Sequence, residues 1–422
     1  MGKSKGGLPL SRLGCFTLAE EKEKAWFPGL KTNTLYEYNK LNNSAKILKT
    51  FSDRSAEGNP LYLTIEKVGN ILVLGSGRST NVAFYDLADD TCEYMELIPV
   101  ENDRKVQYTE NCNFIKSCTH ENSVYLFGYE YPAILKIDMA TRRAAYLDDW
   151  VTEIERRISK LSVSMGYISD YVVVGSFAWA LCECVNAIIR LDLRTDEVEI
   201  IDICSDLDIQ CGICFDGNFW VTGNNEYGNK LLKYNHQFFL EKDIEICSAK
   251  NRNEDYYLPL KERYWPIYPV VDLGKKLLLF SVYPNHVYEF EKEAEQVSIH
   301  PVFEKLIEIR DERLYGLRIL VPRRKKDIIY FVTGNDFMWN EYDIAHDKLS
   351  RYEVMGEGDE EILREYSKIL VGRIIGEDDL IWNLGYKLTL PRFLEHIKYV
   401  SLNEVGDRGE NDNVGVKIYK EC

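Results

Sequence analysis

Three segments between residues 171 and 201 decide the fold: Tyr171-Val-Val-Val-Gly175, Ala187-Ile-Ile-Arg-Leu-Asp192 and the continuation Leu193-Arg-Thr-Asp-Glu-Val-Glu-Ile-Ile201. The first two are short apolar runs rich in β-branched residues, which favour strands. The third starts with a polar turn and then alternates polar and apolar residues, as a strand with one exposed face does. Another strand is expected ahead of the Ser169-Asp170 turn. The stretch therefore predicts four antiparallel strands joined by turns.

The run that ends in Asp192 belongs to an internal repeat. Equivalent runs close at Asn39, Asp86, Asp138, Asp192, Asn235, Glu291 and Asp343. These positions recur about every fifty residues, a period typical of propeller blades, and the β-branched and aromatic content does not fit a helical repeat. The closing Asp or Asn is expected to accept backbone N–H groups two or three residues further on and so fix a hairpin.

The repeat predicts an all-β protein: a seven-bladed β-propeller of four-stranded antiparallel blades with a small C-terminal helical appendix. The propeller is expected to span residues 15–355, with its first strand at Cys15-Phe-Thr-Leu18. The extension, residues 356–422, is expected to hold partial blade strands near 366–375 and 380–383 and one helix from Thr389 to Val400. It could cap the propeller, close its ring or bind a partner, and capping is the first expectation.

The hairpins Ile137-Asp-Met-Ala-Thr141 and Leu191-Asp-Leu-Arg-Thr195 resemble those of kelch-like and quinoprotein-like propellers. The stretches Ala25-Trp-Phe27 to Asn39 and Phe215-Asp-Gly-Asn-Phe-Trp220 also resemble uncharacterised propeller proteins of anaerobic gut bacteria. This resemblance implies a bacterial propeller fold over about residues 15–355 and no particular reaction. The diglycine of kelch blades is missing, so no kelch function follows.

Composition limits the partners. The chain has 422 residues, 52 Lys and Arg against 68 Asp and Glu, and a formal net charge of −16. Such an acidic chain is repelled by phosphate backbones and anionic lipid, so neither nucleic acid nor a membrane is an expected partner. No export signal or run of eighteen apolar residues appears in the sequence, and the eleven cysteines are scattered. We therefore expect a cytoplasmic protein with reduced thiols, either a monomer or part of a complex.

Neither the cysteines nor the histidines form a recognisable metal set. Cys211 and Cys214 fall within an expected inner strand and are expected to be small buried residues, while Cys182 and Cys184 are expected to be loop thiols. The six histidines occupy different repeat positions, unlike ligands that converge from several blades. Phosphate-binding and dinucleotide motifs are missing as well. The sequence thus predicts no metal and no cofactor.

Loop length points to one face of the propeller. In each expected blade, the connection from the second to the third strand and the connection to the next blade are longer than the turns after the first and third strands. Because neighbouring strands run in opposite directions, both kinds of long connection are expected on the same face of the propeller. Function tends to sit on such loops. Aromatic rings beside amides suit a glycan or a peptide, although each ring could instead pack between blades. The expected ligand-binding residues on the loops are Tyr129, Tyr131, Trp179, Tyr227, Tyr283 and Trp339, and those entering the inner strands are Asn113, Gln210, Trp265, Tyr268 and Arg318.

Arg318 is the residue singled out, because it precedes an apolar strand where an unpaired guanidinium would be costly. It could anchor a carboxylate or a hydroxyl-rich ligand, or it could form an ion pair between blades.

These features favour a non-catalytic binding or scaffold propeller that recognises a glycan, peptide or protein partner on the long-loop face. The alternative is a hydrolase or lyase acting on a glycan or peptide, with two of Glu130, Glu183, Glu226 and Asp336 as acid and base. A carboxylate pair about 5–9 Å apart in a deep pocket would favour the enzyme. A structural subunit of a larger complex is a third possibility.

Overall fold

The structure is a computed structural model, and it describes residues 8–9, 15–29, 32–51, 60–100, 104–106, 112–158, 166–225, 227–248, 267–281, 286–303, 319–333 and 338–357. Within these ranges, no helix is both long enough and apolar enough to cross a membrane.

Seven antiparallel sheets follow one another along the chain, and each is one blade. Blade 1 contains β2 (Ala19–Glu20), β3 (Lys24–Pro28), β4 (Thr34–Asn39) and β5 (Ser44–Thr50). Blade 2 contains β6 (Tyr62–Val68), β7 (Ile71–Ser76), β8 (Asn81–Asp86) and β9 (Thr91–Glu96). Blade 3 contains β10 (Phe114–His120), β11 (Ser123–Gly128), β12 (Ile134–Asp138) and β13 (Arg143–Leu147). Blade 4 contains β14 (Ile168–Val174), β15 (Phe177–Cys182), β16 (Ala187–Asp192) and β17 (Val198–Asp202).

Blade 5 contains β18 (Ile209–Phe215), β19 (Phe219–Asn225), β20 (Gly228–Tyr234) and β21 (Leu240–Ser248). Blade 6 contains β22 (Ile267–Asp272), β23 (Lys276–Ser281), β24 (Val287–Glu291) and β25 (Gln296–Ile299). Blade 7 contains β26 (Ile319–Lys325), β27 (Ile328–Thr333), β28 (Met338–Asp343) and β29 (Lys348–Glu353). The prediction of a seven-bladed propeller with four strands in each blade is confirmed. Two details differ. The expected first strand at 15–18 is shifted to β2, and Cys15 forms only an isolated bridge with Gly29. In blade 4, the expected Ser169-Asp170 turn and the run after it both belong to the first strand β14, and the second strand β15 was not predicted.

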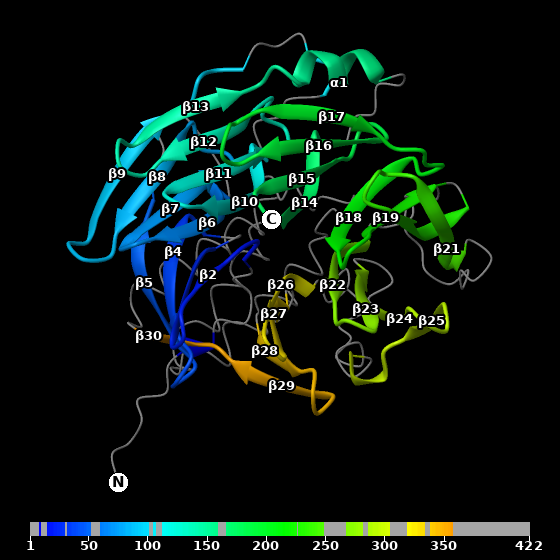
Figure 1. Cartoon of the computed structure of the whole chain (residues 1–422). Coiled ribbons are helices and arrows are strands. Elements are labelled where there is room, and N and C mark those ends of the chain that lie inside the picture. Colours follow the sequence, from blue (N-terminus) through cyan, green and yellow to red (C-terminus); the bar gives the residue numbers. More distant parts are fainter. Residues whose placement is uncertain are drawn as a thin grey trace, which may run out of the picture. The chain divides into compact units, whose positions relative to one another are not determined.

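The blades are arranged around a common centre, with the first strand of each blade inside and the fourth outside (Figure 1). The inner strands β6, β10, β14, β18, β22 and β26 are neighbours in chain order. Each hydrophobic core cluster is shared by two adjacent blades. For example, Trp26 and Leu35 of blade 1 pack with Leu72 and Tyr85 of blade 2. Burial of apolar side chains between blades therefore holds the ring together.

The closing Asp or Asn residues fix the outer hairpins as predicted. Their side-chain oxygens accept a backbone N–H two or three residues further on, at 2.8 to 3.1 Å, in six blades. The bonds come from Leu41 N to Asn39, Ala88 N to Asp86, Thr141 N to Asp138, Arg194 N to Asp192, Gln237 N to Asn235 and His346 N to Asp343. Blade 6 has Glu291 at this position, and its carboxylate pairs with Lys276 instead.

A bulge recurs near the start of the inner strand in blades 2 to 7. In blades 6 and 7 the interrupted register contains Pro269 and Pro322. Proline has no N–H to donate, so it is tolerated where the ladder is broken. The bulges bend each inner strand at the end where the long connections begin.

Blade 1 is extended outward by two further strands. β30 (Met355–Glu357) pairs in parallel with β5, and β1 (Leu8–Pro9) pairs antiparallel with β30. Next to this junction, the rings of Tyr38 and Trp339 lie 4.9 Å apart across blades 1 and 7. Met355–Glu357, directly after blade 7, thus join blade 1 at its outer edge, and the rest of the expected extension lies outside the described residues.

The chain divides into two compact units, Met1–Leu363 and Arg364–Cys422. The strands expected at 366–375 and 380–383 and the helix expected at 389–400 lie outside the described residues. The helix α1 (Val151–Arg157) was not predicted. It lies between blades 3 and 4 and buries Val151 and Ile154 in their shared core.

Candidate functional site

The long connections lie on one side of the ring, which we call the loop face. It carries the loops that follow the second strand of each blade and the connections between blades, such as 77–80, 129–133, 183–186 and 203–208. The opposite ends of the same strands are joined by tight turns, such as Gly69-Asn70 and Gly175-Ser176. The structure thus has the loop arrangement that the sequence predicts.

A chain of backbone hydrogen bonds, which we call the belt, links blades 2, 3 and 4 on this face. Within a blade, the residue after the second strand donates its N–H to the carbonyl of a residue just before the first strand. Between blades, the residue before the first strand donates to the preceding blade's second-strand loop. The bonds are Gly77 N to Leu61 O (2.8 Å), Asn113 N to Gly77 O (3.1 Å), Tyr129 N to Asn113 O (2.9 Å), Tyr167 N to Tyr129 O (2.6 Å) and Glu183 N to Tyr167 O (3.0 Å). The belt fixes the backbone from which neighbouring side chains project.

Five side chains from these three blades form what we call the loop-face cluster: Arg78, Cys112, Tyr129, Glu130 and Glu183. The Glu130 backbone N–H donates to Cys112 O at 3.1 Å, and the charges of Glu130, Arg78 and Glu183 all affect the pKa of the Cys112 thiol. The pKa of Cys112 is raised, chiefly by burial and further by the two carboxylates. Arg78 is also buried. Segments far apart in sequence thus bring one cation, two carboxylates, a thiol and a phenol to one place.

Glu183 has the most unusual environment in this cluster. Its carboxylate accepts a hydrogen bond from the Tyr129 hydroxyl and one from the Gly166 backbone N–H at 3.4 Å. The side chain is partly exposed, but protein atoms crowd around its carboxyl group, and burial raises the pKa of Glu183 to about 7. The two hydrogen bonds lower the pKa of Glu183, but they do so by less than burial raises it. Glu183 therefore exchanges its proton near neutral pH.

The packing around Gly166 supports this arrangement. A Cβ atom at Gly166 would lie 2.3 to 2.6 Å from the Tyr129 ring. Only glycine allows the ring to approach the backbone this closely, so Gly166 permits the position from which Tyr129 reaches Glu183.

Two amides at the start of inner strands were predicted to bind ligand. The Asn113 amide N–H donates to Ser76 Oγ at 2.9 Å, and that of Gln210 donates to Asn186 Oδ1 at 2.6 Å. Both side chains are buried, and their carbonyl oxygens have no hydrogen-bond partner among the described residues. Each is therefore an unused acceptor near the loop face.

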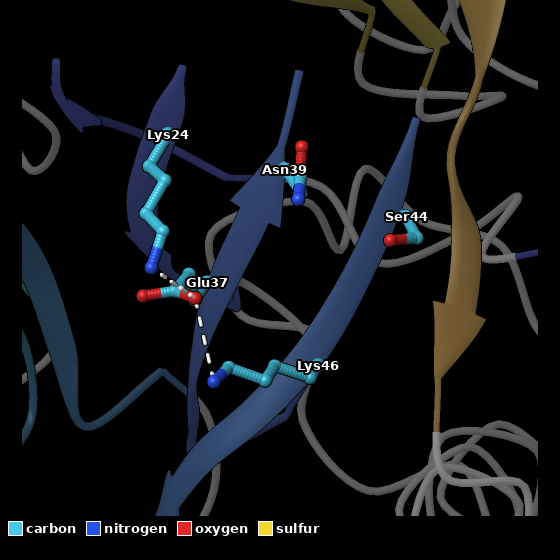
Figure 2. Close-up of a pocket in the computed structure, with 5 residues that line it drawn as sticks. All are labelled: Lys24, Glu37, Asn39, Ser44 and Lys46. Carbon is cyan, nitrogen blue, oxygen red and sulfur yellow. Dashed lines mark hydrogen bonds and ion pairs between the residues drawn. The ribbon is translucent and has the colours of Figure 1, made fainter. Parts of the chain in front are cut away.

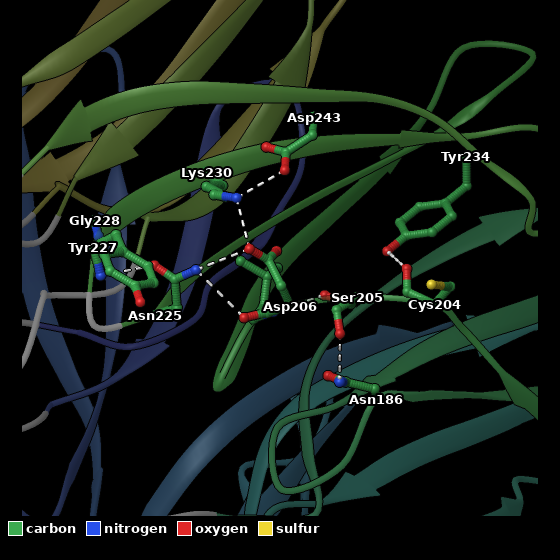
Figure 3. Close-up of polar contacts among 11 residues, drawn as sticks. Asn186, Cys204, Ser205, Asp206, Asn225, Tyr227, Gly228, Lys230, Tyr234 and Asp243 are labelled. Carbon is green, nitrogen blue, oxygen red and sulfur yellow. Dashed lines mark hydrogen bonds and ion pairs between the residues drawn. The ribbon is translucent and has the colours of Figure 1, made fainter.

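Tyr227 lies at the tip of the second-strand loop of blade 5 and is 68% exposed. Its backbone N–H is held by Asn225 Oδ1 at 2.9 Å, and the Asn225 amide N–H reaches Asp206 Oδ2 at 3.1 Å (Figure 3). Lys230 Nζ then bridges Asp206 and Asp243, at 2.7 Å to each. This network joins Asn225 and Lys230 to the connection from blade 4, and the exposed ring of Tyr227 lies beside it.

Three of the predicted aromatic residues pack within the ring instead of projecting from the loop face. Tyr131 is 3% exposed and donates its hydroxyl to Ile98 O at 2.7 Å. Trp179 packs against Phe219 in the core between blades 4 and 5. Trp339 is buried between blades 7 and 1. For these three residues, packing between blades is the role that the structure supports.

Other predicted residues are not placed. Arg318, Trp265, Tyr283, Glu226 and Asp336 lie outside the described residues, and Tyr268 is described only as part of the backbone of β22.

Several of the described cysteines are buried within the strands. Cys211 and Cys214 are buried in the inner strand β18, as predicted. Cys182 was expected in a loop but ends β15 with no exposed surface. No group of three or more His, Cys, Asp or Glu residues suited to a metal occurs among the residues that the structure describes.

A small pocket of about 160 Å³ lies on blade 1, lined by Lys24, Glu37, Asn39, Ser44 and Lys46. Lys24 and Lys46 both converge on Glu37, at 3.0 and 3.4 Å (Figure 2). The other oxygen of Glu37 accepts the Trp26 indole N–H at 3.1 Å. The pocket is smaller than typical ligand sites, and its carboxylate is already paired, so it is part of the blade structure.

Arg78, Cys112 and the pairing of Tyr129 with Glu183 were missed by sequence reasoning. Arg78 was not singled out from the sequence, and Glu183 entered only as a carboxylate of the enzyme alternative. Aligning the repeats would have pointed to this part of each blade, because Arg78 and Glu130 lie two residues, and Glu183 one residue, after the end of the second strand.

No protein-family model matches the chain, and neither does any curated protein. Solved structures do match. A catalytically inactive variant of virginiamycin B lyase from Staphylococcus aureus, solved with quinupristin, has 12% sequence identity and a TM-score of 0.54 over 78% of this chain and 95% of that one. The extracellular domain of the one-component system BT4673 from B. thetaiotaomicron has 13% identity and a TM-score of 0.50 over 82% of this chain and 40% of that chain. The Cps50 (Swd1) β-propeller domain of Myceliophteria thermophila has 10% identity and a TM-score of 0.50 over 81% of this chain and 99% of that one.

These similarities define the class of protein: the chain is a seven-bladed β-propeller. At such low identity they show the fold alone. The resemblance to kelch-like, quinoprotein-like or gut-bacterial propellers is not confirmed, and the matching structures include a lyase, an extracellular domain and a β-propeller domain.

Proposed function

We propose that this propeller is a binding module that recognises a polar ligand, namely a glycan, a peptide or a segment of a protein partner, at the loop-face cluster. The observation that carries the proposal is the convergence of Arg78, Glu130 and Glu183 from three blades onto one backbone belt. Rigid presentation lowers the entropy lost on binding, because the polar groups are already held in place.

The exposed ring of Tyr227 supports a second contact on the same face. Tyrosine is enriched at binding hot spots because it offers a large rigid surface and a polar end. The hydrogen bonds of Asn225 hold its turn before any partner arrives. The ligand is therefore expected to extend from the loop-face cluster toward blade 5.

Glycan and peptide arrays test the proposal. Glu130→Gln and Glu183→Gln should each weaken a bound array member about tenfold, because each removes a charged hydrogen-bond acceptor. Glu96→Gln, on the exposed outer strand β9, is the matched control and should bind like the wild type. Unchanged binding in both cluster variants would contradict the proposal.

One observation favours a second function, that of a hydrolase or lyase. A glutamate with a pKa of about 7 can act as a general acid or base at neutral pH, and such catalysis contributes roughly 10²–10⁴-fold. If an array ligand is turned over, Glu183→Gln should lower kcat by at least 10²-fold with little change in binding. If the ligand is recovered intact after incubation, this result would contradict the enzymatic function and favour the binding function.

A cytoplasmic location also remains our proposal. All nine described cysteines are free thiols, which supports a reducing compartment. Alkylation of the denatured protein without reductant should modify every cysteine.

A further inference from the structure

We infer that the loop face carries a carbohydrate subsite between blades 4 and 5, which binds an uncharged oligosaccharide by stacking a sugar ring on Tyr227. The inference rests on the proposed binding function and names the ligand class. Its basis is an exposed aromatic ring beside a hydrogen-bonded group of amides and carboxylates that comes from both blades (Figure 3).

The connection between the two blades, residues 203–208, is fixed to both of them. On the side of blade 4, the Ile203 N–H donates to Asn186 O at 3.1 Å, and the Asn186 amide donates to Ser205 O at 3.1 Å. On the side of blade 5, the Asp208 N–H donates to Asn224 O at 2.8 Å. The polar groups of this connection are therefore held in place before a ligand arrives, which lowers the entropy lost on binding.

Gln210 supplies an unused acceptor at this place. Its amide nitrogen donates to Asn186 Oδ1 at 2.6 Å and to Val185 O at 3.4 Å, whereas its oxygen has no hydrogen-bond partner among the described residues. Gln210 is 1% exposed, but Asn186, to which it is bonded, is exposed. A buried amide oxygen without a donor is costly, and a hydroxyl group that enters beside Asn186 would supply one.

Asp206 supplies a second acceptor, on the surface. The Asn225 amide and Lys230 Nζ both bond to its Oδ2, at 3.1 and 2.7 Å, and within the described chain its Oδ1 accepts no hydrogen bond. Asp243 also holds Lys230, at 2.7 Å. The network thus contains two carboxylates and one ammonium that is already engaged twice, so an uncharged ligand is favoured over an acidic one.

Tyr227 supplies the apolar contact. It is 68% exposed, and Asn225 Oδ1 accepts the backbone N–H groups of Tyr227 and Gly228 at 2.9 and 3.2 Å. The face of an aromatic ring carries partial negative charge and attracts C–H groups. A six-membered sugar ring has a face of C–H groups and a rim of hydroxyls, so one ligand can stack on the ring and donate to the neighbouring acceptors.

The backbone of the connection disfavours an extended peptide, which is held mainly by main-chain hydrogen bonds. Many backbone groups here already have partners within the protein. They are the N–H groups of Ile203, Leu207 and Asp208 and the carbonyls of Cys204, Ser205 and Asp206. Recognition therefore depends on the side chains, whose amide and carboxylate groups suit sugar hydroxyls.

Isothermal titration calorimetry with defined oligosaccharides tests the inference. The neutral probes are cellohexaose, maltohexaose, xylohexaose and mannohexaose, and hexagalacturonate is the acidic probe. At least one neutral probe should bind roughly tenfold or more tightly than hexagalacturonate, because the acidic probe brings further negative charge to the two carboxylates.

Variants of the exposed ring locate the subsite. Tyr227→Ala should weaken the bound neutral probe roughly tenfold, whereas Tyr227→Phe keeps the ring and should stay within about threefold of the wild type. The matched control is Phe239→Ala, because Phe239 is 67% exposed on the turn at the opposite end of the same blade, and its variant should bind like the wild type. Asn186→Ala should also weaken binding about tenfold, because it removes a hydrogen-bonding amide. Melting temperatures show whether each variant is folded, and the Tyr227 variants decide the outcome if Asn186→Ala is unstable.

Three results would overturn the inference: no neutral probe binds, hexagalacturonate binds as tightly as the neutral probes, or Tyr227→Ala binds like the wild type. If no sugar binds but array peptides lose affinity in Glu130→Gln, the proposed function stands while the inference fails. If a neutral probe loses affinity in Tyr227→Ala and is unaffected by Glu130→Gln and Glu183→Gln, the carbohydrate subsite stands while the role of the loop-face cluster fails.

Discussion

Glu183 shows how a single residue acquires its chemistry from its surroundings. It follows β15, where the belt fixes its backbone, and Tyr129 from the neighbouring blade reaches its carboxylate. Burial opposes the charged form more strongly than these hydrogen bonds favour it. The carboxyl is therefore poised between its two forms at neutral pH, in contrast to Glu37, whose carboxylate is held by Lys24 and Lys46.

The raised pKa of Glu183 predicts a pH-dependent stability. The folded protein holds this proton more tightly than the unfolded chain does, so the contribution is complete below the ordinary glutamate pKa and is lost as pH rises through about 7. Glu183→Gln mimics the protonated form. Its free energy of unfolding, measured relative to that of the wild type, should therefore increase by about 1–3 kcal/mol when the pH is raised from about 5 to about 8. Denaturant unfolding at the two pH values measures this difference, and an equal difference at both would contradict it.

Asp170 links three inner strands. Its carboxylate pairs with Lys116 Nζ of β10 at 2.7 Å and accepts the Ile213 N–H of β18 at 3.2 Å. Asp170→Ala should cost about 3–5 kcal/mol of unfolding free energy, because it leaves a half-buried ammonium and a buried N–H without this acceptor. Asp170→Asn retains an acceptor and should cost less. Equal losses for the two variants in urea unfolding would contradict the role given to the neutral acceptor and would assign the whole effect to the carboxylate charge.

At the scale of elements, the hairpins were predictable and the inserted helix was not predicted. An Asp or Asn at a fixed place in the repeat has a local role, so the sequence alone was enough to indicate the turn. Helix α1 occurs once, in a connection, and the repeat carries no information about it. The spacing of Val151, Ile154 and Ile158, with Glu153 bonded to Arg157, was the available signal.

The hairpin bond can be tested in blade 2, where Asp86 Oδ1 accepts the Ala88 N–H at 2.8 Å. Asp86→Ala removes the acceptor and should lower the unfolding free energy by about 1 kcal/mol. Glu96→Ala, on the exposed outer strand of the same blade, is the control and should stay within about 0.5 kcal/mol of the wild type. A loss no larger than that of the control would contradict the role given to Asp86.

At the scale of the whole ring, closure depends on a strand between β5 and β1. Gly356 is the central residue of β30 and pairs with Ala45 on one side and Leu8 on the other. Gly356→Pro removes a backbone donor and should cost about 1–3 kcal/mol, whereas Gly356→Ala should cost much less. Thermal unfolding of both variants provides the measurement. Equal melting temperatures would show that β30 does not stabilise the closed ring.

For the whole molecule, the blade repeat could be predicted from the sequence, whereas the loop-face cluster could not. The blade period follows from strand and turn residues, which recur in every unit. The loop-face cluster does not, because the residues that follow the second strand differ from blade to blade, as Arg78, Glu130 and Glu183 do, and only the ring brings them together. Rings such as Trp179 and Trp339 were misleading, because aromatic residues serve packing and binding equally well.

Hydrogen–deuterium exchange with the tightest array ligand tests the central claim most directly. The account predicts protection on binding in the loop-face segments around 76–79, 112–114, 128–131, 166–168 and 182–185. The turns at the opposite ends of the strands, such as 86–91 and 192–198, should exchange as in the free protein. Protection confined to those turns or to the outer strands, with the loop-face segments unchanged, would contradict the claim that ligands bind at the loop-face cluster.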